Sequence, residues 1–344
     1  MLIRSKAPLR LGLAGGGTDV SPYCDLFGGC VLNATINKYA YCTLTPNETS
    51  TIELLALDID EKAVTLSTPT IDIDYQDKLI LHKGVYNRVV KEFKLQKSLS
   101  FSLATYAEAP AGSGLGTSST MVVAILQAFV EWLKLPLSEY DVAKLAYDIE
   151  RNDLGLAGGK QDQYAATFGG FNFIEFYENE NVIVNPLRIK DWIRNEFENS
   201  ILLYFTGISR SSAEIISEQK KSSEEGNEAT IIAMHNLKRE AYAMKEALLK
   251  GNFQQLTECL NSGWEYKKKT STIVSNKMIE DIIEVGMVNG AGAAKISGAG
   301  GGGFIMFICD PLKRIQLSNA LSQLGGRVSN VKFSFSGAEG WTIY

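Results

Sequence analysis

The feature that most restricts the fold of this chain is a glycine-rich run over residues 110–120, which leads directly into the apolar stretch 121–135. Gly112, Gly114 and Gly116 occupy alternate positions of this run and can hold a tight turn in backbone conformations that other residues avoid. A helix that begins there points its free N–H groups and the positive end of its dipole into the turn, where a phosphate is the natural occupant. The run therefore predicts a phosphate-binding loop before a buried helix. The alternative is a plain turn with a serine helix cap.

Composition narrows the functions that are open to this chain of 344 residues. The formal net charge of −5 gives no general electrostatic reason to bind nucleic acid or an anionic membrane. The basic run Lys267-Lys268-Lys269 is interpreted as a solvated helix end. The five cysteines are scattered without a Cys-x-x-Cys pair, and His82 and His235 are the only histidines, which argues against a zinc site or a His-centred triad.

Targeting signals are not expected in this sequence. We expect no signal peptide, and no apolar segment reaches the roughly 18 residues of a membrane span. Unpaired cysteines suit a reducing compartment. The sequence therefore predicts a soluble cytoplasmic protein that binds small molecules, with neither nucleic acid nor membrane as a partner. A homodimer is compatible with the sequence, which does not specify the oligomeric state.

Hydrophobic periodicity predicts an α+β protein of two domains, residues 1–195 and residues 196–344, packed around a shared cleft. No internal repeat or Pro-rich linker separates the two. The stretch 121–135 is apolar nearly all round, which predicts a buried helix. Three short strands are expected across 51–75, and a final strand is expected at 328–335.

A carboxylate and a charged segment follow the buried helix. In the helix that opens at Ser138, Glu150 lies at the edge of the apolar stripe, so its side chain is expected to face the interior or a cleft. Residues 155–159 then break the helix, and the segment Lys160-Gln-Asp162-Gln follows. Taken alone, Glu150 and Asp162 are also compatible with ordinary surface carboxylates.

A second glycine-rich segment covers residues 295–304. Gly298, Gly300 and Gly303 have the spacing G-x-G-x-x-G, but a strand follows them instead of a helix, which excludes a dinucleotide-binding fold. The chain also lacks the sequence G-x-x-x-x-G-K-[ST] of a P-loop. A glycine-only loop between two strands allows another backbone or a ligand to approach closely. The alternative is a simple hairpin.

A third glycine-rich segment, residues 8–19, places Arg10 on a strand before a loop that ends in Thr18 and Asp19. Asp19 can hydrogen-bond a polyol or cap the segment that follows it. The three segments in this order resemble the motifs of the GHMP kinase superfamily, which includes galactokinase, homoserine kinase, mevalonate kinase and phosphomevalonate kinase. The resemblance spans essentially the whole chain.

The resemblance implies an ATP-dependent small-molecule kinase with Mg²⁺ as a second cofactor. It also implies an N-terminal ribosomal-protein-like α/β domain and a C-terminal ferredoxin-like α+β domain around a shared cleft. Ser118 and Glu150 match the Mg²⁺ ligands of the family, and Asp162 matches its proposed catalytic base. The cation that stabilises the developing charge is expected to be one of three, Lys6, Arg10 or Lys160.

Further binding residues follow from the same resemblance. The residues expected to bind ATP are Pro110, Gly112, Ser113, Gly114, Leu115, Gly116, Thr117, Ser118 and Ser119. Ser119 is an alternative to Ser118 as the metal ligand, because the motif here reads Thr-Ser-Ser. The residues expected to bind the acceptor substrate are Gly15, Gly16, Gly17, Thr18, Asp19, Arg210, Gly300 and Gly301.

The segment 8–19, which matches the first motif of the superfamily, also indicates a class of acceptor. Gly16 and Gly17 stand where galactokinases carry Glu-His, which makes room for a larger or more anionic acceptor. This motif, together with Gly158–Gln163, resembles the branch that phosphorylates the anomeric hydroxyl of D-glycero-D-manno-heptose 7-phosphate in bacterial GDP-heptose synthesis for surface polysaccharide. The segment 206–212 resembles a segment of that branch, so Arg210 is expected to hold the substrate phosphate, with a surface ion pair as the alternative.

Two other functions remain open from the sequence. A free-sugar anomeric kinase of the fucose or galactose type has similar motifs and differs in needing no phosphate on its acceptor. A non-catalytic regulator of the same fold would bind sugar or nucleotide only, and the presence of Ser118, Glu150 and Asp162 argues against it.

Overall fold

The larger of two sheets contains eight strands of the described chain. The computed structural model describes residues 1–95, 98–208 and 212–344. The strands of this sheet are β1 (Leu2–Ala14), β2 (Gly29–Pro46), β3 (Thr51–Ala56), β4 (Glu61–Leu66), β5 (Phe101–Ala107), β6 (Phe171–Phe176), β7 (Val182–Pro186) and β12 (Glu339–Ile343). Their order is β12-β1-β2-β5-β3-β4, and β6 pairs with β2 and β7. The β3–β5 pair is parallel, whereas β1 pairs antiparallel with both β2 and β12.

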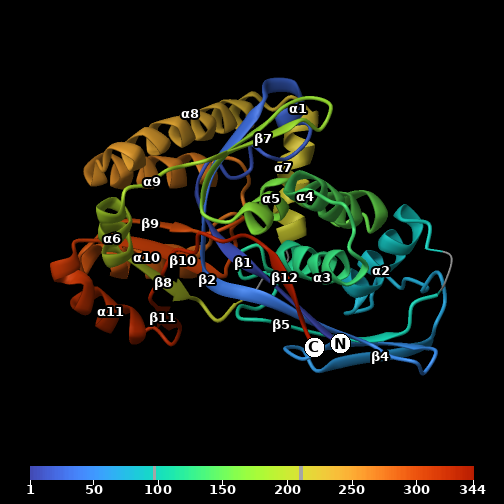
Figure 1. The fold of residues 1–344 in the computed structure, drawn as a ribbon. Coiled ribbons are helices and arrows are strands. Elements are labelled where there is room, and N and C mark those ends of the chain that lie inside the picture. Colours follow the sequence, from blue (N-terminus) through green and yellow to red (C-terminus); the bar gives the residue numbers. More distant parts are fainter. Residues whose placement is uncertain (96–97, 209–211) are drawn as a thin grey trace.

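Helices of the first half pack on this sheet (Figure 1). They are α1 (Tyr23–Phe27), α2 (Ile80–Glu92), α3 (Thr117–Leu133), α4 (Glu139–Asp148), a π-helical turn (Ile149–Asp153) and α5 (Gln161–Phe168). The predicted buried helix is confirmed in α3, which begins within the serine run, four residues before Met121. Its apolar side chains fill the core between the sheet, α2 and α4.

The smaller sheet has the strand order β11-β8-β10-β9. Its strands are β8 (Ile201–Phe205), β9 (Ala291–Ile296), β10 (Phe304–Cys309) and β11 (Arg327–Ser329). The helices of this half are α6 (Asp191–Ser200), α7 (Ser212–Glu224), α8 (Glu228–Lys250), α9 (Phe253–Lys268), α10 (Lys277–Val288), a 3-10 turn (Pro311–Lys313) and α11 (Arg314–Ser322). In the described chain, α8 and α9 lie side by side across β1 and β9, which joins the two halves (Figure 1).

Strand β1 connects two hydrophobic cores. Ile3 and Ala7 lie in the core under α3, whereas Leu9, Leu11 and Leu13 lie in the core shared with the smaller sheet and with α8 and α9. The two ends of the chain meet in this sheet, because Leu2 on β1 is paired with Ile343 on β12 (Figure 1). The last strand therefore returns to the sheet of the first half, and the division at residue 195 stays a prediction.

Two predicted strands differ from the structure. Residues 71–75 form no strand, because the backbone of Ile71 bonds to a side chain of α2: Asn87 Oδ1 accepts from Ile71 N and Asn87 Nδ2 donates to Ile71 O, both at 2.8 Å. The strand expected at 328–335 ends at Ser329, and beyond it Phe333 makes a single bridge to Ile36.

No helix in the described part of the chain is long and apolar enough to cross a membrane.

Candidate active site

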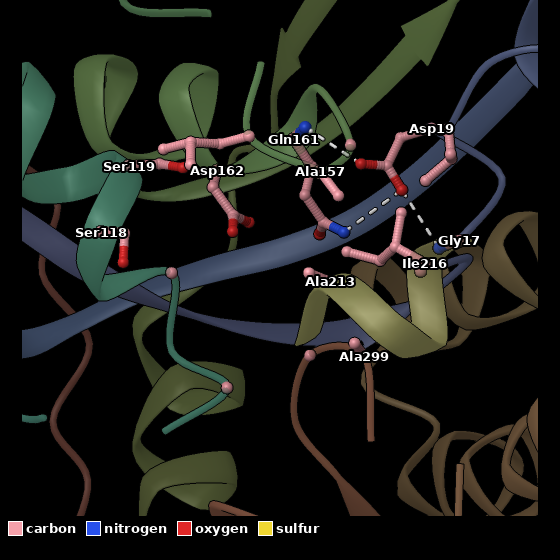
Figure 2. A pocket seen from close by; sticks show the side chains of 18 of the residues that line it. Gly17, Asp19, Ser118, Ser119, Ala157, Gln161, Asp162, Ala213, Ile216 and Ala299 are labelled. Atoms are coloured by element: carbon pink, nitrogen blue, oxygen red, sulfur yellow. Dashed lines mark hydrogen bonds between the residues drawn. The ribbon is translucent and has the colours of Figure 1, made fainter. Parts of the chain in front are cut away.

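A cleft with a volume of about 320 Å³ lies between the two halves of the molecule. The N-terminus of α3, the loop before α5 and the loop after β1 contribute from the first half, and α7, the end of α9 and the loop between β9 and β10 contribute from the second. Ser118 and Ser119 lie at one end and Gly17 and Asp19 at the other, with Asp162 between them (Figure 2). The cleft thus gathers all three glycine-rich segments.

The predicted phosphate loop enters α3 without a side-chain cap. Gly116 is the N-cap residue and adopts a left-handed conformation with a φ of 77°, and no side chain caps the helix. The alternative of an ordinary serine cap is therefore not observed. Ser118 lines the cleft and is partly exposed. A ligand in the cleft therefore meets uncapped N–H groups at the positive end of the α3 dipole.

The glycines of the segments 110–120 and 295–304 allow one loop to pack on the other. A Cβ at Gly114 would lie 2.2 Å from the carbonyl oxygen of Ser297, and a Cβ at Gly303 would lie 2.2 Å from that of Ser113. Phe304 N donates to Ser113 O at 2.9 Å. The expectation that a backbone approaches the glycine-only loop closely is confirmed, and the smaller sheet thereby positions the phosphate loop.

Arg10 and Asp162 form a buried ion pair beside this loop. Arg10 Nη2 lies 2.6 Å from Asp162 Oδ1, Nε donates to the same oxygen at 2.7 Å, and Nη1 donates to Gly114 O at 2.6 Å. Arg10 is buried, whereas the Asp162 side chain is 22% exposed and borders the cleft. The lack of a side chain at Gly116 leaves room for the carboxylate, because a Cβ there would lie 3.1 Å from Asp162 Cγ. The pair therefore links β1, α5 and the phosphate loop.

Glu150 is held at the π-helical turn, within reach of the start of α3. Its carboxylate is 1% exposed and accepts a short hydrogen bond from Gln163 Nε2, which also donates to Ser119 Oγ at 3.1 Å. Arg151 Nη1 lies 3.7 Å from Glu150 Oε1. A π-helical turn is rare and widens the helix locally, and such turns occur frequently at functional sites. Both serines border the cleft, but Ser119 is buried and accepts from Gln163, whereas Ser118 is partly exposed (Figure 2).

At the far end of the cleft, Asp19 organises the loop after β1. Its carboxylate accepts from Gly17 N at 3.1 Å, from Gln161 N at 3.1 Å and from Gln161 Nε2 at 3.3 Å (Figure 2). Thr18 points inward, where its hydroxyl donates to the carbonyl oxygens of Gly15 and Cys30, both at 2.8 Å. Thr18 therefore shapes the loop, while Asp19 borders the cleft.

Several predicted site residues do not reach the cleft. Lys160 Nζ lies against Cys24 Sγ at 3.6 Å and Asp25 Oδ1 at 3.3 Å, so its predicted role at the transferring phosphoryl group is not supported by this geometry. Lys160 is the N-cap residue of α5, and its buried side chain pairs with Asp25, whereas Asp162 pairs with Arg10. Lys6 pairs with Glu339 at 2.8 Å.

Other predicted binding residues support loops instead of lining this cleft. Arg210 lies outside the described residues. Ser113 and Leu115 are fully buried, and Gly301 N donates to Val274 O at 2.7 Å. The residues of the prediction that border the cleft are Arg10, Gly16, Gly17, Asp19, Gly112, Gly114, Gly116, Thr117, Ser118, Ser119, Glu150, Asp162 and Gly300. Those described residues of the prediction that do not border it are Gly15, Thr18, Pro110, Ser113, Leu115, Lys160 and Gly301.

Comparison with known families decides the classification. The family described as "GHMP kinases N terminal domain" matches residues 81–170, and that described as "GHMP kinases C terminal" matches residues 244–326. The chain belongs to the GHMP kinase family. The predicted ATP-dependent small-molecule kinase is therefore confirmed at the level of the family, as is the two-domain α+β fold.

Individual relatives of this GHMP kinase carry more specific names. It is 50% identical over 341 residues to "D-glycero-alpha-D-manno-heptose 7-phosphate kinase" of Campylobacter jejuni, covering 99% of both chains. A solved structure of a D-glycero-D-manno-heptose 1-phosphate kinase from Bacteroides thetaiotaomicron has a TM-score of 0.84 and 48% identity over 99% of both chains. Galactokinase of Lactococcus lactis, at 18% identity and a TM-score of 0.78 over 98% and 94% of the chains, shares the fold alone.

The side chains in the cleft suit a Mg²⁺ ion held jointly with a nucleotide. Glu150 and Ser118 offer carboxylate and hydroxyl oxygens, the hard ligands that Mg²⁺ prefers. No group of three or more His, Cys, Asp or Glu side chains in the described chain could hold a metal by itself. This agrees with Mg²⁺ sites that use one or two protein ligands together with substrate phosphates and water.

Sequence reasoning missed three polar residues of this kinase. Gln161 binds Asp19, and Gln163 joins Glu150 to Ser119, as described above. Lys267 is not a solvated helix end: it is 7% exposed, it borders the cleft, and its Nζ donates to Gly16 O at 2.9 Å. A signal was present, because Lys267 continues the apolar stripe of α9 at helical spacing after Leu260 and Trp264. Burial lowers the pKa of Lys267 to about 8.

Proposed function

We propose that this GHMP kinase transfers the γ-phosphate of ATP to the anomeric hydroxyl of D-glycero-D-manno-heptose 7-phosphate. The product would be the 1,7-bisphosphate, used for GDP-heptose and surface polysaccharide synthesis. The observation that carries the proposal is the 50% identity over 99% of both chains to the Campylobacter jejuni kinase of that name. The cleft supports it, because one end offers uncapped N–H groups for phosphates and the other end offers polar groups around Asp19.

At the nucleotide end, we assign the triphosphate to the glycine-rich loop and the first turn of α3. Gly112, Gly114 and Gly116 border the cleft without side chains, while Ser113 and Leu115 between them are buried, so backbone N–H groups can contact phosphate oxygens. Ser118 and Glu150 would hold Mg²⁺, which neutralises charge on the β- and γ-phosphates when bound. Gln163 keeps the Glu150 carboxylate in place through its hydrogen bond.

At the centre of the cleft, we assign proton transfer to Asp162. Arg10 occupies Oδ1 with two donors, and no described residue donates to Oδ2. Oδ2 is therefore the atom that would accept the proton of the acceptor hydroxyl as the phosphoryl group transfers. Arg10 would orient this carboxylate and add positive charge where negative charge develops on the transferring group.

A free-sugar kinase is the second candidate. The fucokinase/guanylyltransferase of Bacteroides fragilis is 25% identical over an alignment of 354 positions, and the match covers 94% of this chain and 36% of that protein. The two candidates differ in one requirement, a phosphate on the acceptor.

The deciding experiment measures ADP release with Mg·ATP across a panel of acceptors: heptose 7-phosphate, free heptose, mannose 6-phosphate, fucose and galactose. Selective turnover of heptose 7-phosphate is expected, and ³¹P NMR should identify an anomeric phosphate next to the original ester. Faster turnover of a free sugar would contradict the proposal and favour the second candidate. Turnover that yields a phosphate at another carbon would contradict the assignment of the anomeric hydroxyl.

A further inference from the structure

Two lysines lie beside the loop after β1, of which Lys267 is buried and borders the cleft, whereas Lys295 is partly buried and lies behind the loop. Lys267, in the last turn of α9, donates from Nζ to Gly16 O at 2.9 Å, and Lys295, on β9, donates from Nζ to Leu13 O at 3.1 Å. Neither lysine forms an ion pair with any residue that the structure describes. Arg10, the third cation of this region, already has a partner in Asp162. Each of the two lysines therefore donates to a backbone carbonyl and has no carboxylate in direct contact among the described residues.

The surroundings of Lys267 disfavour its charge in the absence of a ligand. Burial lowers the pKa of Lys267 to about 8, with Arg10 adding repulsion and Asp19 adding attraction. Burial and the charges of Lys267 and Arg10 lower the pKa of Lys295 to about 7. Asp19 attracts the charge of Lys267 but forms no ion pair with it, and the Asp19 oxygens accept from Gly17 and Gln161. A buried charge is costly unless it is paired, so an anion that enters here removes a penalty already built into the fold.

The position of Lys267 separates this anion from the nucleotide. A Cβ at Gly17 would lie 3.2 Å from Lys267 Nζ, so the ammonium group lies directly beside the Gly16-Gly17 backbone. Gly17 and Ser118 lie on opposite sides of Asp162 (Figure 2). An anion at Lys267 is therefore on the acceptor side of the proposed base, away from the N-terminus of α3. A side chain at Gly17 would also meet this ammonium group, which gives a physical reason for glycine here.

We propose that Lys267, supported by the positive potential of Lys295, binds the phosphate ester that the acceptor sugar already carries. This inference rests on the proposed function and adds a residue to it: Lys267 would be the residue that distinguishes a sugar phosphate from a free sugar. The chemical class of ligand is a phosphate dianion on a carbon remote from the hydroxyl that Asp162 faces. A single ammonium hydrogen-bonds a phosphate oxygen as a strong, charge-assisted donor.

The test compares Lys267→Met with Lys269→Met, a control at the C-cap of the same helix whose side chain is exposed. Affinities for heptose 7-phosphate, free heptose and ATP are measured by calorimetry, each ligand alone, and KM and kcat are measured in parallel. Lys267→Met should weaken binding of heptose 7-phosphate and raise its KM by about 10- to 100-fold, as expected for a lost charge-assisted hydrogen bond. Binding of free heptose and of ATP should remain within twofold, and Lys269→Met should behave as wild type.

Two further measurements keep the outcome decisive. If Lys267→Met does not fold, wild-type protein still provides a test: between pH 7 and pH 10 the acceptor phosphate stays dianionic, so its affinity should fall above pH 8 while that of free heptose stays level. Arg210→Met addresses the other candidate for the phosphate contact. Loss of phosphate preference in that variant, with the preference intact in Lys267→Met, would overturn the inference and leave the proposed function standing. Failure of the wild type to phosphorylate heptose 7-phosphate would contradict the proposed function itself.

Discussion

Arg10 and Asp162 stand 152 positions apart in the sequence, yet Nε and Nη2 of the arginine both bind one carboxylate oxygen of the aspartate, at 2.7 and 2.6 Å. This relationship fixes the orientation of Asp162, because a carboxylate held through Oδ1 by two donors cannot rotate freely. Oδ2 is left for the cleft, toward which the side chain points in Figure 2. Arg10 in turn is anchored by Gly114 O, so this hydrogen bond connects the glycine-rich segments 8–19 and 110–120.

Replacing Asp162 by asparagine should remove proton acceptance while keeping the shape of the side chain. We expect kcat for Asp162→Asn to fall by about 10²- to 10⁴-fold, the range for loss of a general base. The dissociation constant for ATP should change little, because backbone N–H groups are assigned to the triphosphate and Arg10 keeps its hydrogen bond to Gly114 O in the phosphate loop. Steady-state kinetics and calorimetry with ATP measure both quantities, and Asp60→Asn on an exposed turn is the control. Turnover close to that of wild type would contradict the assignment.

Substituting Gly114 tests the contact between the two glycine-rich loops. Gly114 has a φ of 84° and a Cβ there would lie 2.2 Å from Ser297 O, whereas Gly226 has a φ of 69° and open space around it. Both alanine variants carry left-handed strain of about 1–2 kcal/mol. Only Gly114→Ala must also displace backbone, so it should lose about 1–3 kcal/mol more in free energy of unfolding and raise KM for ATP. Equal losses in urea unfolding would refute this contact.

Glu150→Gln tests the metal site. In the native protein Gln163 Nε2 donates to the Glu150 carboxylate. The substitution removes the negative charge of this carboxylate and replaces it with a neutral amide. The Mg²⁺ concentration for half-maximal activity should rise by about tenfold or more at fixed ATP, because Mg²⁺ prefers carboxylate oxygen. Activity titrated with MgCl₂ measures this, and Glu139→Gln, exposed at the start of α4, is the control. An unchanged Mg²⁺ dependence would exclude Glu150 as a ligand.

Local patterns explain why the phosphate loop was predictable from the sequence. Gly112, Gly114 and Gly116 and the helix after them form one continuous segment, so both the turn and the buried helix follow from neighbouring residues. The strand predicted at 71–75 failed for a nonlocal reason, because Asn87 takes the backbone hydrogen bonds of Ile71. Strand pairing depends on partners that a single sequence pattern does not reveal.

The parts of the site that were not predictable depend on the direction of individual side chains. Lys160 and Asp162 are two residues apart at the start of α5, yet Lys160 pairs with Asp25 and Asp162 pairs with Arg10. Gln163 contributes only because α5 packs on α3 and the π-helical turn, which places it beside Glu150. The charge of Lys267 predicts an exposed side chain, whereas its position on the apolar stripe of α9 indicates the burial that is observed.

The burial of Lys267 makes the stability of the ligand-free protein depend on pH. Its pKa is about 8 in the folded protein against an ordinary 10.5, so between these values the unfolded chain binds more protons than the folded one. The contribution of Lys267 to the free energy of unfolding is therefore unfavourable below pH 8 and disappears as pH rises to about 10.5. The negative charge of Asp19 reduces this penalty, and the positive charge of Arg10 increases it. Lys295, whose pKa is about 7, adds a second penalty that also disappears as pH rises.

Urea unfolding of wild type and Lys267→Met at pH 7 and pH 10 measures this effect. The shift of the Lys267 pKa corresponds to about 3 kcal/mol, so the variant should gain that much stability relative to wild type at pH 7, and the gain should shrink at pH 10. Comparing the two proteins cancels the titration of buried cysteines and tyrosines, which both share. Saturating heptose 7-phosphate at pH 7 should stabilise the wild type more than the variant, because the anion pairs with the charged lysine. A stability difference that is independent of pH would mean that Lys267 is as fully protonated in the folded protein as in the unfolded chain. The penalty of an unpaired buried charge, which an entering anion is proposed to remove, would then be absent.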